Sequence, residues 1–143
     1  RQMVILPSFR QSILRCNMVF KLKTSKETMQ VFNDISASIH LQPFALAKIA
    51  IALSIRNSAE LDADSFNTDT DGLELNRQTI TGEYDDLFKA LIVNKNGCDL
   101  SDEEYFPKYL KAHLDRGAKL LYAEYKYSGS NFYNHLANLD KSI

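Results

Sequence analysis

The stretch LQPFALAKIAIALSIR, residues 41–56, decides the fold class of this chain. Pro43 suits the first turn of a helix, because the N–H group that proline lacks has no intrahelical partner there. The residues from Phe44 to Ile55 are apolar on nearly every side of a helix, a pattern typical of a helix surrounded by other elements. We therefore expect a central buried helix that begins at Pro43, with the other elements packed around it.

The residues before this helix predict a strand and then another helix. Residues 20–25 alternate apolar and basic side chains, the period of a half-exposed strand, and no hairpin partner follows nearby. Thr24 and Glu27 have the spacing of a capping box, and apolar residues then recur at helical spacing to about Ser38. The order strand, helix, helix is similar to a ribbon-helix-helix DNA reader, in which strands of two subunits pair. An edge strand protected by lysines is the alternative interpretation.

The residues after the central helix predict an exposed acidic loop and two more helices. Residues 57–72 are rich in Ser, Asn, Asp and Thr, and an irregular pair or short hairpin follows at residues 73–80. One helix is expected from Thr81 to a turn at residues 96–97. A second should begin at the capping box of residues 101–104, bend at Pro107 and continue to about residue 127.

Length and composition predict one compact, mainly α domain, a bundle of about four to five helices with a short N-terminal strand. The chain has 143 residues, 45% of them hydrophobic and 24% charged. We expect an N-terminal extension at residues 1–17, the helical domain at 18–127, and a C-terminal extension with a short helix at 128–143. Two cysteines and no apolar stretch long enough for export or a membrane span favour the cytoplasm and no membrane partner.

The net charge of -1 hides a segregation of charge along the chain. Residues 1–57 hold eight basic and two acidic residues, residues 58–104 hold three basic and thirteen acidic, and residues 105–143 hold six basic and three acidic. A polyanion site is therefore compatible with a nearly neutral total. The alternative is that the segments neutralise one another within the fold or between subunits.

No residue pattern predicts a metal or cofactor site. The histidines His40, His113 and His135 lie on separate predicted elements without metal-ligand spacing. His113 could face a phosphate or a proton-transfer site, but a helix contact is the favoured interpretation. The acidic cluster of residues 83–86 could hold magnesium for a nuclease, although carboxylates at a helix start also offset the dipole. Residues 67–72 resemble half of a calcium-binding loop whose second half is missing.

Four ordered blocks of sequence resemble the DndE family of the bacterial DNA phosphorothioation system. They are FKLKTSK at 20–26, LQPFALAKIAIALS at 41–54, Gly72 with residues 76–77 and 81–83, and KAHLDRG at 111–117. Together the blocks span about residues 18–126. The resemblance implies a small, mainly helical protein that works with a cysteine desulfurase, an iron–sulfur protein similar to ATP sulfurylase, and an ATPase.

The resemblance also implies a homo-oligomer, with tetramers in the family, that binds double-stranded DNA and favours nicked duplex through surface lysines. It carries over no catalytic residue and no cofactor. The DNA-binding residues it implies here are Lys21, Lys23, Lys26 and Lys48, and less securely Lys108, Lys111, Arg116 and Lys119. Two other functions stay open: a metal-dependent DNA nickase that uses His113 or Glu83, and a structural adaptor without DNA affinity.

Overall fold

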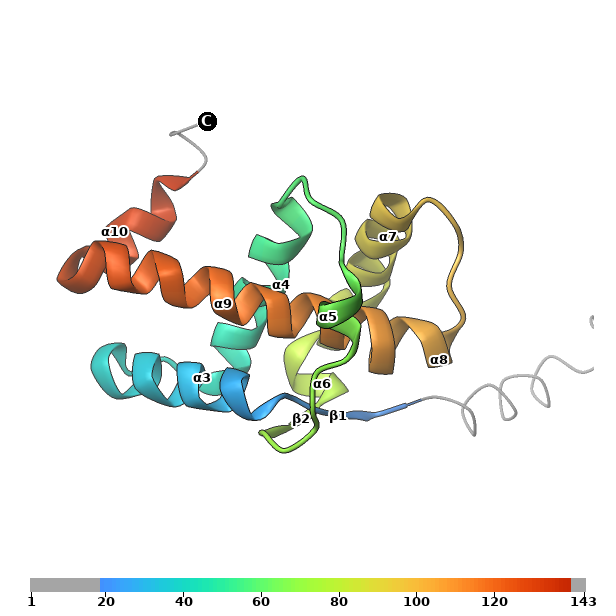
Figure 1. The fold of residues 1–143 in the computed structure, drawn as a ribbon, viewed down its shortest axis with the longest axis horizontal. Coiled ribbons are helices and arrows are strands. Elements are labelled where there is room, and N and C mark those ends of the chain that lie inside the picture. The colour runs from blue at the N-terminus through green and yellow to red at the C-terminus, as the bar shows by residue number, and fades with distance from the viewer. Residues whose placement is uncertain (1–18, 140–143) are drawn as a thin grey trace, which may run out of the picture.

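Helix α4 (Pro43–Arg56) lies against the long helix α9 (Lys111–Ser128) in the computed structural model, which describes residues 19–139 (Figure 1). Leu46, Ala50 and Ile51 of α4 are fully buried, as expected for a central helix. One side of α4 is open to solvent, because Phe44 is 42% exposed and Lys48 lies beside it. The predicted mainly α fold is confirmed.

The crossing of α4 and α9 requires glycine at position 117. A Cβ atom on Gly117 would lie 1.8 Å from the carbonyl oxygen of Ala50, far inside van der Waals contact. The two backbones therefore approach more closely than any side chain would allow. This approach fixes the position at which α9 crosses the central helix.

The predicted strand is present and pairs with a distant segment of the same chain. Strand β1 (Lys21–Lys23) is antiparallel to β2 (Glu74–Asn76), with Leu22 opposite Leu75. Both leucines are buried. In a ribbon-helix-helix protein the strand would pair with that of a second subunit, so the observed pairing within the chain differs from that arrangement. The irregular pair expected at residues 73–80 is replaced by β2 and a helical turn, α6 (Arg77–Ile80).

Helix α3 (Lys26–Ile39) begins one residue later than the capping prediction. Its N-cap is Ser25, whose hydroxyl oxygen accepts the backbone N–H of Thr28. The predicted cap, Thr24, was wrong because its hydroxyl accepts the backbone N–H of Leu73 and donates to the carbonyl of Ser25. Thr24 thus joins the end of β1 to the segment that leads into β2.

The segment between α4 and α9 is more broken than its periodicity predicts. The loop at 57–72 contains the short helix α5 (Ala63–Phe66). The helix expected from Thr81 starts instead as a 3-10 turn, η1 (Gly82–Tyr84), and continues as α7 (Asp85–Asn96). Gly82 has a positive φ of 53°, which interrupts the helical backbone between α6 and α7.

The capping box at residues 101–104 is present, with Ser101 and Glu104 each accepting the other's backbone N–H. It starts α8 (Asp102–Glu104), after which the chain widens into a π-helical turn, η2 (Tyr105–Leu110), that contains Pro107. This turn is the physical form of the predicted bend. Beyond α9 follow η3 (Gly129–Asn131) and α10 (Phe132–Ala137). The buried Phe132 fixes α10 on the domain.

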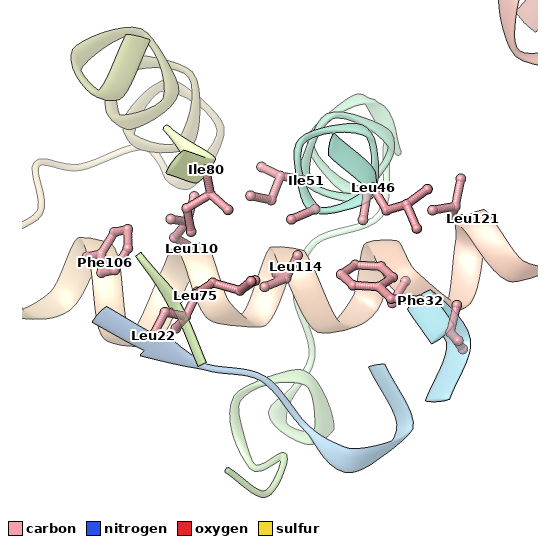
Figure 2. Packing of buried hydrophobic residues seen from close by; sticks show 14 of the residues in the cluster. Leu22, Phe32, Leu46, Ile51, Leu75, Ile80, Phe106, Leu110, Leu114 and Leu121 are labelled. Carbon is pink, nitrogen blue, oxygen red and sulfur yellow. The ribbon is translucent and has the colours of Figure 1, made fainter. Parts of the chain in front are cut away.

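The core lies between α9, α4, α3 and the two strands (Figure 2). Figure 2 shows Phe32 and Leu114 pointing toward α4, and Leu22 and Leu75 packing beneath α9. Within residues 19–139 no single helix is long and apolar enough to cross a membrane. Helices α3 and α4 have the necessary length and apolar composition only when they are taken together, and their axes are bent by 115° at the break between them.

Candidate nucleic-acid interface

Four of the predicted lysines gather where β1 leads into α3. Lys21 and Lys23 point outward from β1, because the buried Leu22 between them points into the core. Lys26 is the first residue of α3. Lys119 of α9 lies 4.0 Å from Glu27, which brings it to the same helix start. We call Lys21, Lys23, Lys26 and Lys119 the β1–α3 surface.

Acidic side chains of the same chain partly balance the β1–α3 surface. Lys21 Nζ lies 3.0 Å from Glu74 Oε2, and this hydrogen bond and charge lower the pKa of Glu74. Both this pair and Lys119 with Glu27 are exposed, so they stabilise the fold little and compete weakly with a phosphate. Among the described residues, no acidic side chain forms an ion pair with Lys23 or Lys26.

Lys111 points into the domain and not toward solvent. Its ammonium group donates to Asp115 Oδ2 at 2.8 Å and to the carbonyl oxygen of Asp69 at 3.0 Å, and also to the Thr68 hydroxyl. Asp115 is 2% exposed and also accepts from the backbone N–H of Ser25 at 3.2 Å. These bonds join α9, the start of α3 and the acidic loop, and they occupy Lys111.

Asp115 is a residue that the charge pattern did not single out. Besides the contacts above, its oxygens accept the hydroxyls of Thr28 at 2.7 Å and Thr68 at 2.6 Å. A buried carboxylate needs this many donors to offset its lost hydration. Its place within the family-like block at 111–117 was the only signal that could have found it.

Arg116 is likewise occupied by internal acceptors. Its Nε donates to Ser54 Oγ at 2.8 Å and its Nη2 to the Ser54 carbonyl at 2.7 Å. Its Nη1 donates to the carbonyls of Ala59 at 2.9 Å and Glu60 at 3.1 Å. The guanidinium group therefore satisfies carbonyls at and beyond the C-terminal end of α4. Burial lowers the pKa of Arg116.

The remaining two predicted lysines are exposed on other elements. Lys48 lies on α4, with its ammonium group 5.7 Å from the centre of the Phe44 ring. Lys108 lies on the π-helical turn η2. The structure thus brings together half of the predicted binding residues and turns Lys111 and Arg116 inward.

In the acidic cluster at the start of α7, Asp85 forms an internal ion pair with Arg77. Arg77 is 7% exposed and donates to Asp85 at 2.7 Å and to Asp102 at 2.8 Å. Its guanidinium carbon lies 4.8 Å from the centre of the Phe106 ring. Burial alone would raise the pKa of Asp85 and Asp102, but hydrogen bonds from Arg77 outweigh it and lower both. Within residues 19–139 no group of three metal-binding side chains is present.

His113 makes the helix contact that the sequence favoured. It is 2% exposed, and its Nδ1 lies 2.8 Å from Ser54 Oγ, between α9 and α4. Burial, reinforced by the positive charges of Arg116 and Lys95, lowers the pKa of His113 to about 4. The imidazole is therefore neutral at pH 7. The calcium-like loop also acts structurally, because Asp69 accepts the backbone N–H of Lys26 at 2.9 Å.

The fold and the site define a small, mainly helical domain with an exposed cationic surface and buried ion pairs. The profile of the family described as "DNA sulphur modification protein DndE" matches residues 21–128. The chain belongs to the DndE family, which is involved in DNA phosphorothioation. This confirms the resemblance stated from the sequence.

Two solved structures share this fold. DndE from Escherichia coli B7A, described as involved in DNA phosphorothioation modification, has 17% identity and a TM-score of 0.58, over 71% of this chain and 96% of that one. A DndE G21/24K mutant involved in DNA phosphorothioation has 17% identity and a TM-score of 0.55, over 72% of this chain and 97% of that one. At this identity the likeness concerns the fold alone. No curated protein matches the sequence.

Proposed function

We propose that this protein is a DNA-binding accessory component of the phosphorothioation machinery, which binds duplex DNA, and nicked duplex preferentially, through the β1–α3 surface. The observation that carries the proposal is the exposure of Lys23 and Lys26, which form no ion pair among the described residues and lie beside the weakly paired Lys21 and Lys119. Glu74 lies opposite Lys23 on β2, but its carboxylate forms its ion pair with Lys21. Membership of the DndE family supports DNA as the polyanion.

Lysines on a strand and a helix start suit contact with the sugar-phosphate backbone. An ammonium group binds phosphate as a point charge and reads no base pattern. A nick adds a flexible joint and no new base edges, so preference for nicked duplex would come from easier bending. We therefore expect affinity that depends strongly on salt and weakly on sequence.

The proposed interface excludes two residues and keeps two as peripheral contacts. Lys111 and Arg116 bind acceptors within the domain, and releasing them would leave Asp115 and the end of α4 unsatisfied. Lys48 and Lys108 are exposed and could reach phosphates only at other positions on a bound duplex or from another subunit.

The proposal also includes assembly of the chain into a homo-oligomer, which the resemblance implies is a tetramer. It further includes contacts with the desulfurase, the iron–sulfur protein and the ATPase of the cytoplasmic machinery. Tyr84, the residue that precedes α7, and Leu87 and Leu91 of α7 are 59%, 56% and 43% exposed and share one face by their helical spacing. We assign this α7 face to a second copy of the chain. Several linked subunits raise the effective concentration of each lysine at the duplex.

Fluorescence anisotropy with intact and nicked duplexes of one sequence, at several salt concentrations, tests the proposal. The Lys23→Ala/Lys26→Ala variant should bind every sequence more weakly and lower the salt slope by about one per lost phosphate contact. The matched control, Lys89→Ala/Lys126→Ala, removes two charges elsewhere and should bind as the wild type does. Equal weakening in both variants would contradict the proposed surface.

Two further assays separate the two other functions. Relaxation of supercoiled plasmid that requires a metal ion would favour a nickase. Capture of the other phosphorothioation proteins, with no DNA binding at low salt, would favour an adaptor whose lysines meet acidic partner surfaces.

A further inference from the structure

A small pocket, which we call the cavity, lies between α5, α7, η2 and α9. Its volume is about 130 Å³, and its lining includes Phe66 of α5, Lys95 of α7, Tyr109 of η2 and His113 of α9. The cavity is open to solvent on one side and has room for several water molecules. It therefore has the size for a small ion.

A chain of hydrogen bonds joins Arg116, Ser54 and His113. Arg116 Nε always donates, and here it donates to Ser54 Oγ at 2.8 Å. The Ser54 hydroxyl then has its hydrogen for the next contact, His113 Nδ1 at 2.8 Å. In the tautomer in which Ser54 donates to Nδ1, the neutral ring carries its own proton on Nε2, and this is the tautomer that an anion at Nε2 would select.

The Nε2 atom of His113 reaches the open space of the cavity. Within residues 19–139 no acceptor contacts Nε2, yet every fully buried side-chain nitrogen or oxygen there has a partner. His113 is 2% exposed and lines this cavity, so Nε2 meets its open space. A donor in this position is open to an acceptor from solvent, which a water molecule or a small anion can supply.

The charges around the cavity favour an anion. Lys95 lies on its wall and uses its ammonium group for only one described contact, the carbonyl oxygen of Asn57. Arg116 stands behind His113, and its positive field reaches the ring. Glu60 is the acidic residue at the rim, and it is exposed to solvent, which screens its charge.

The geometry points to a site for a small tetrahedral oxyanion, of the size of sulfate or phosphate, held by His113 Nε2–H and the Lys95 ammonium group. The edge-to-face rings of Phe66 and Tyr109, 5.0 Å apart, form the wall beside it. The same chemistry occurs in the free ion and in the terminal phosphate of a DNA strand. This site is independent of the proposed duplex surface.

Titration with sodium sulfate at constant ionic strength, followed by the ¹⁵N signals of the His113 ring, tests the inference. The wild type should show a saturable change at Nε2, while sodium chloride gives none. Lys95→Met should weaken sulfate binding at least tenfold. Lys89→Met, on the same helix but outside the cavity, removes the same charge and should leave binding unchanged.

A 5′-phosphorylated dinucleotide and its 5′-hydroxyl form identify the source of the anion. Saturation by sulfate identifies a free ion, and saturation only by the phosphorylated dinucleotide identifies a strand end; both support the site. No saturable change with any of these anions, or equal weakening by Lys95→Met and Lys89→Met, would overturn it. Lys95→Met should bind intact duplex as the wild type does, so this test and that of the duplex surface fail separately.

Discussion

At the scale of single residues, the direction in which a cation points decides its role. Lys111 and Arg116 lie five residues apart on one helix and both turn inward, where carboxylate and carbonyl oxygens surround them. Removing Lys111 would leave the buried Asp115 carboxylate without its cation, which costs about 3–5 kcal/mol. Lys23 and Lys26 form no such buried contact within the described part of the chain, so their ammonium groups are available to a ligand.

Glu74 should act as an internal competitor of DNA. Because its carboxylate holds Lys21 at 3.0 Å, Glu74→Gln should release that lysine and strengthen duplex binding. An exposed pair contributes little, so we expect a gain in affinity of no more than about fivefold. Anisotropy at 50 and 150 mM salt measures it. Glu103→Gln, an exposed acid on α8, should change the affinity little, and an equal gain there would assign the effect to net charge alone.

His113 should make stability fall in a defined acid range. Its pKa is about 4 in the folded protein against an ordinary 6.5, so between these values the unfolded chain binds a proton that the folded protein does not. The free energy of unfolding should therefore drop by roughly 3 kcal/mol as the pH falls from 6.5 to 4. Urea unfolding at each pH measures this. His113→Gln should flatten the profile, and the exposed His40→Asn should not.

The carboxylates that bind Arg77 should affect the free energy of unfolding at a lower pH than His113 does. The pKa values of Asp85 and Asp102 are lowered, so their stabilisation is present above pH 3.8 and is lost as the pH falls further, through their folded values. A loss confined to pH below 3.8, with none between 6.5 and 4, would show that His113 charges without penalty.

At the scale of elements, the packing of α9 on α4 organises the domain. Gly117→Ala would place a methyl group 1.8 Å from the Ala50 carbonyl oxygen, so the helices would have to separate along their whole contact. We expect a loss of about 3 kcal/mol or more in the free energy of unfolding, measured by urea titration. Ala123→Ser, exposed on the same helix, should cost less than about 0.5 kcal/mol. Equal losses would mean that the crossing tolerates separation.

The elements that periodicity predicted correctly are those that are determined by residues close together in the sequence. The apolar face of α3, the apolar run of α4 and the glycine-ended α7 are all encoded by residues within a few positions of one another. The partner of β1 could not be predicted in this way, because it lies about fifty residues further along the chain. The choice of Ser25 over Thr24 as the cap also depends on a distant contact, the Leu73 N–H group.

The candidate site was predictable in part for the same reason. Alternation along β1 is sufficient to place Lys21 and Lys23 outside once Leu22 is inside. Whether Lys111 or Arg116 faces solvent depends instead on which loop covers that side of α9. Their partners Asp69 and Ala59 come from the acidic loop, whose path no local pattern describes.

At the scale of the whole molecule, the acidic middle segment folds back onto both basic segments. Asp69 meets the start of α3, Glu74 meets β1, and Thr68 meets Lys111 of α9. Acidic residues of the middle segment therefore neutralise part of the positive charge of the basic segments, but they do so completely only where the cation is buried. The exposed lysines form a small cationic surface on each subunit, and a small surface binds a long duplex tightly only when it is repeated.

The α7 face should supply that repetition by joining copies of the chain. Burying Leu87 and Leu91 between subunits removes apolar surface from water, at about 25 cal/mol per Å², and a carboxylate placed there would oppose it. Light scattering after size exclusion should give the wild type a mass that is a multiple of 16.3 kDa and give Leu87→Glu/Leu91→Glu the monomer mass. Both side chains are exposed in the subunit, so the variant should keep its helical circular dichroism.

The same variant links assembly to DNA binding. It leaves Lys23 and Lys26 untouched, so a subunit should retain its own weak affinity and lose only the gain that comes from linked contacts, which reaches about 10²–10⁴ in multivalent systems. Tyr127→Glu, a charge placed on a side chain that is 82% exposed and away from α7, should change neither mass nor affinity. If the wild type proved to be monomeric and still bound duplex with the affinity expected of the assembly, the α7 face would have no part in binding.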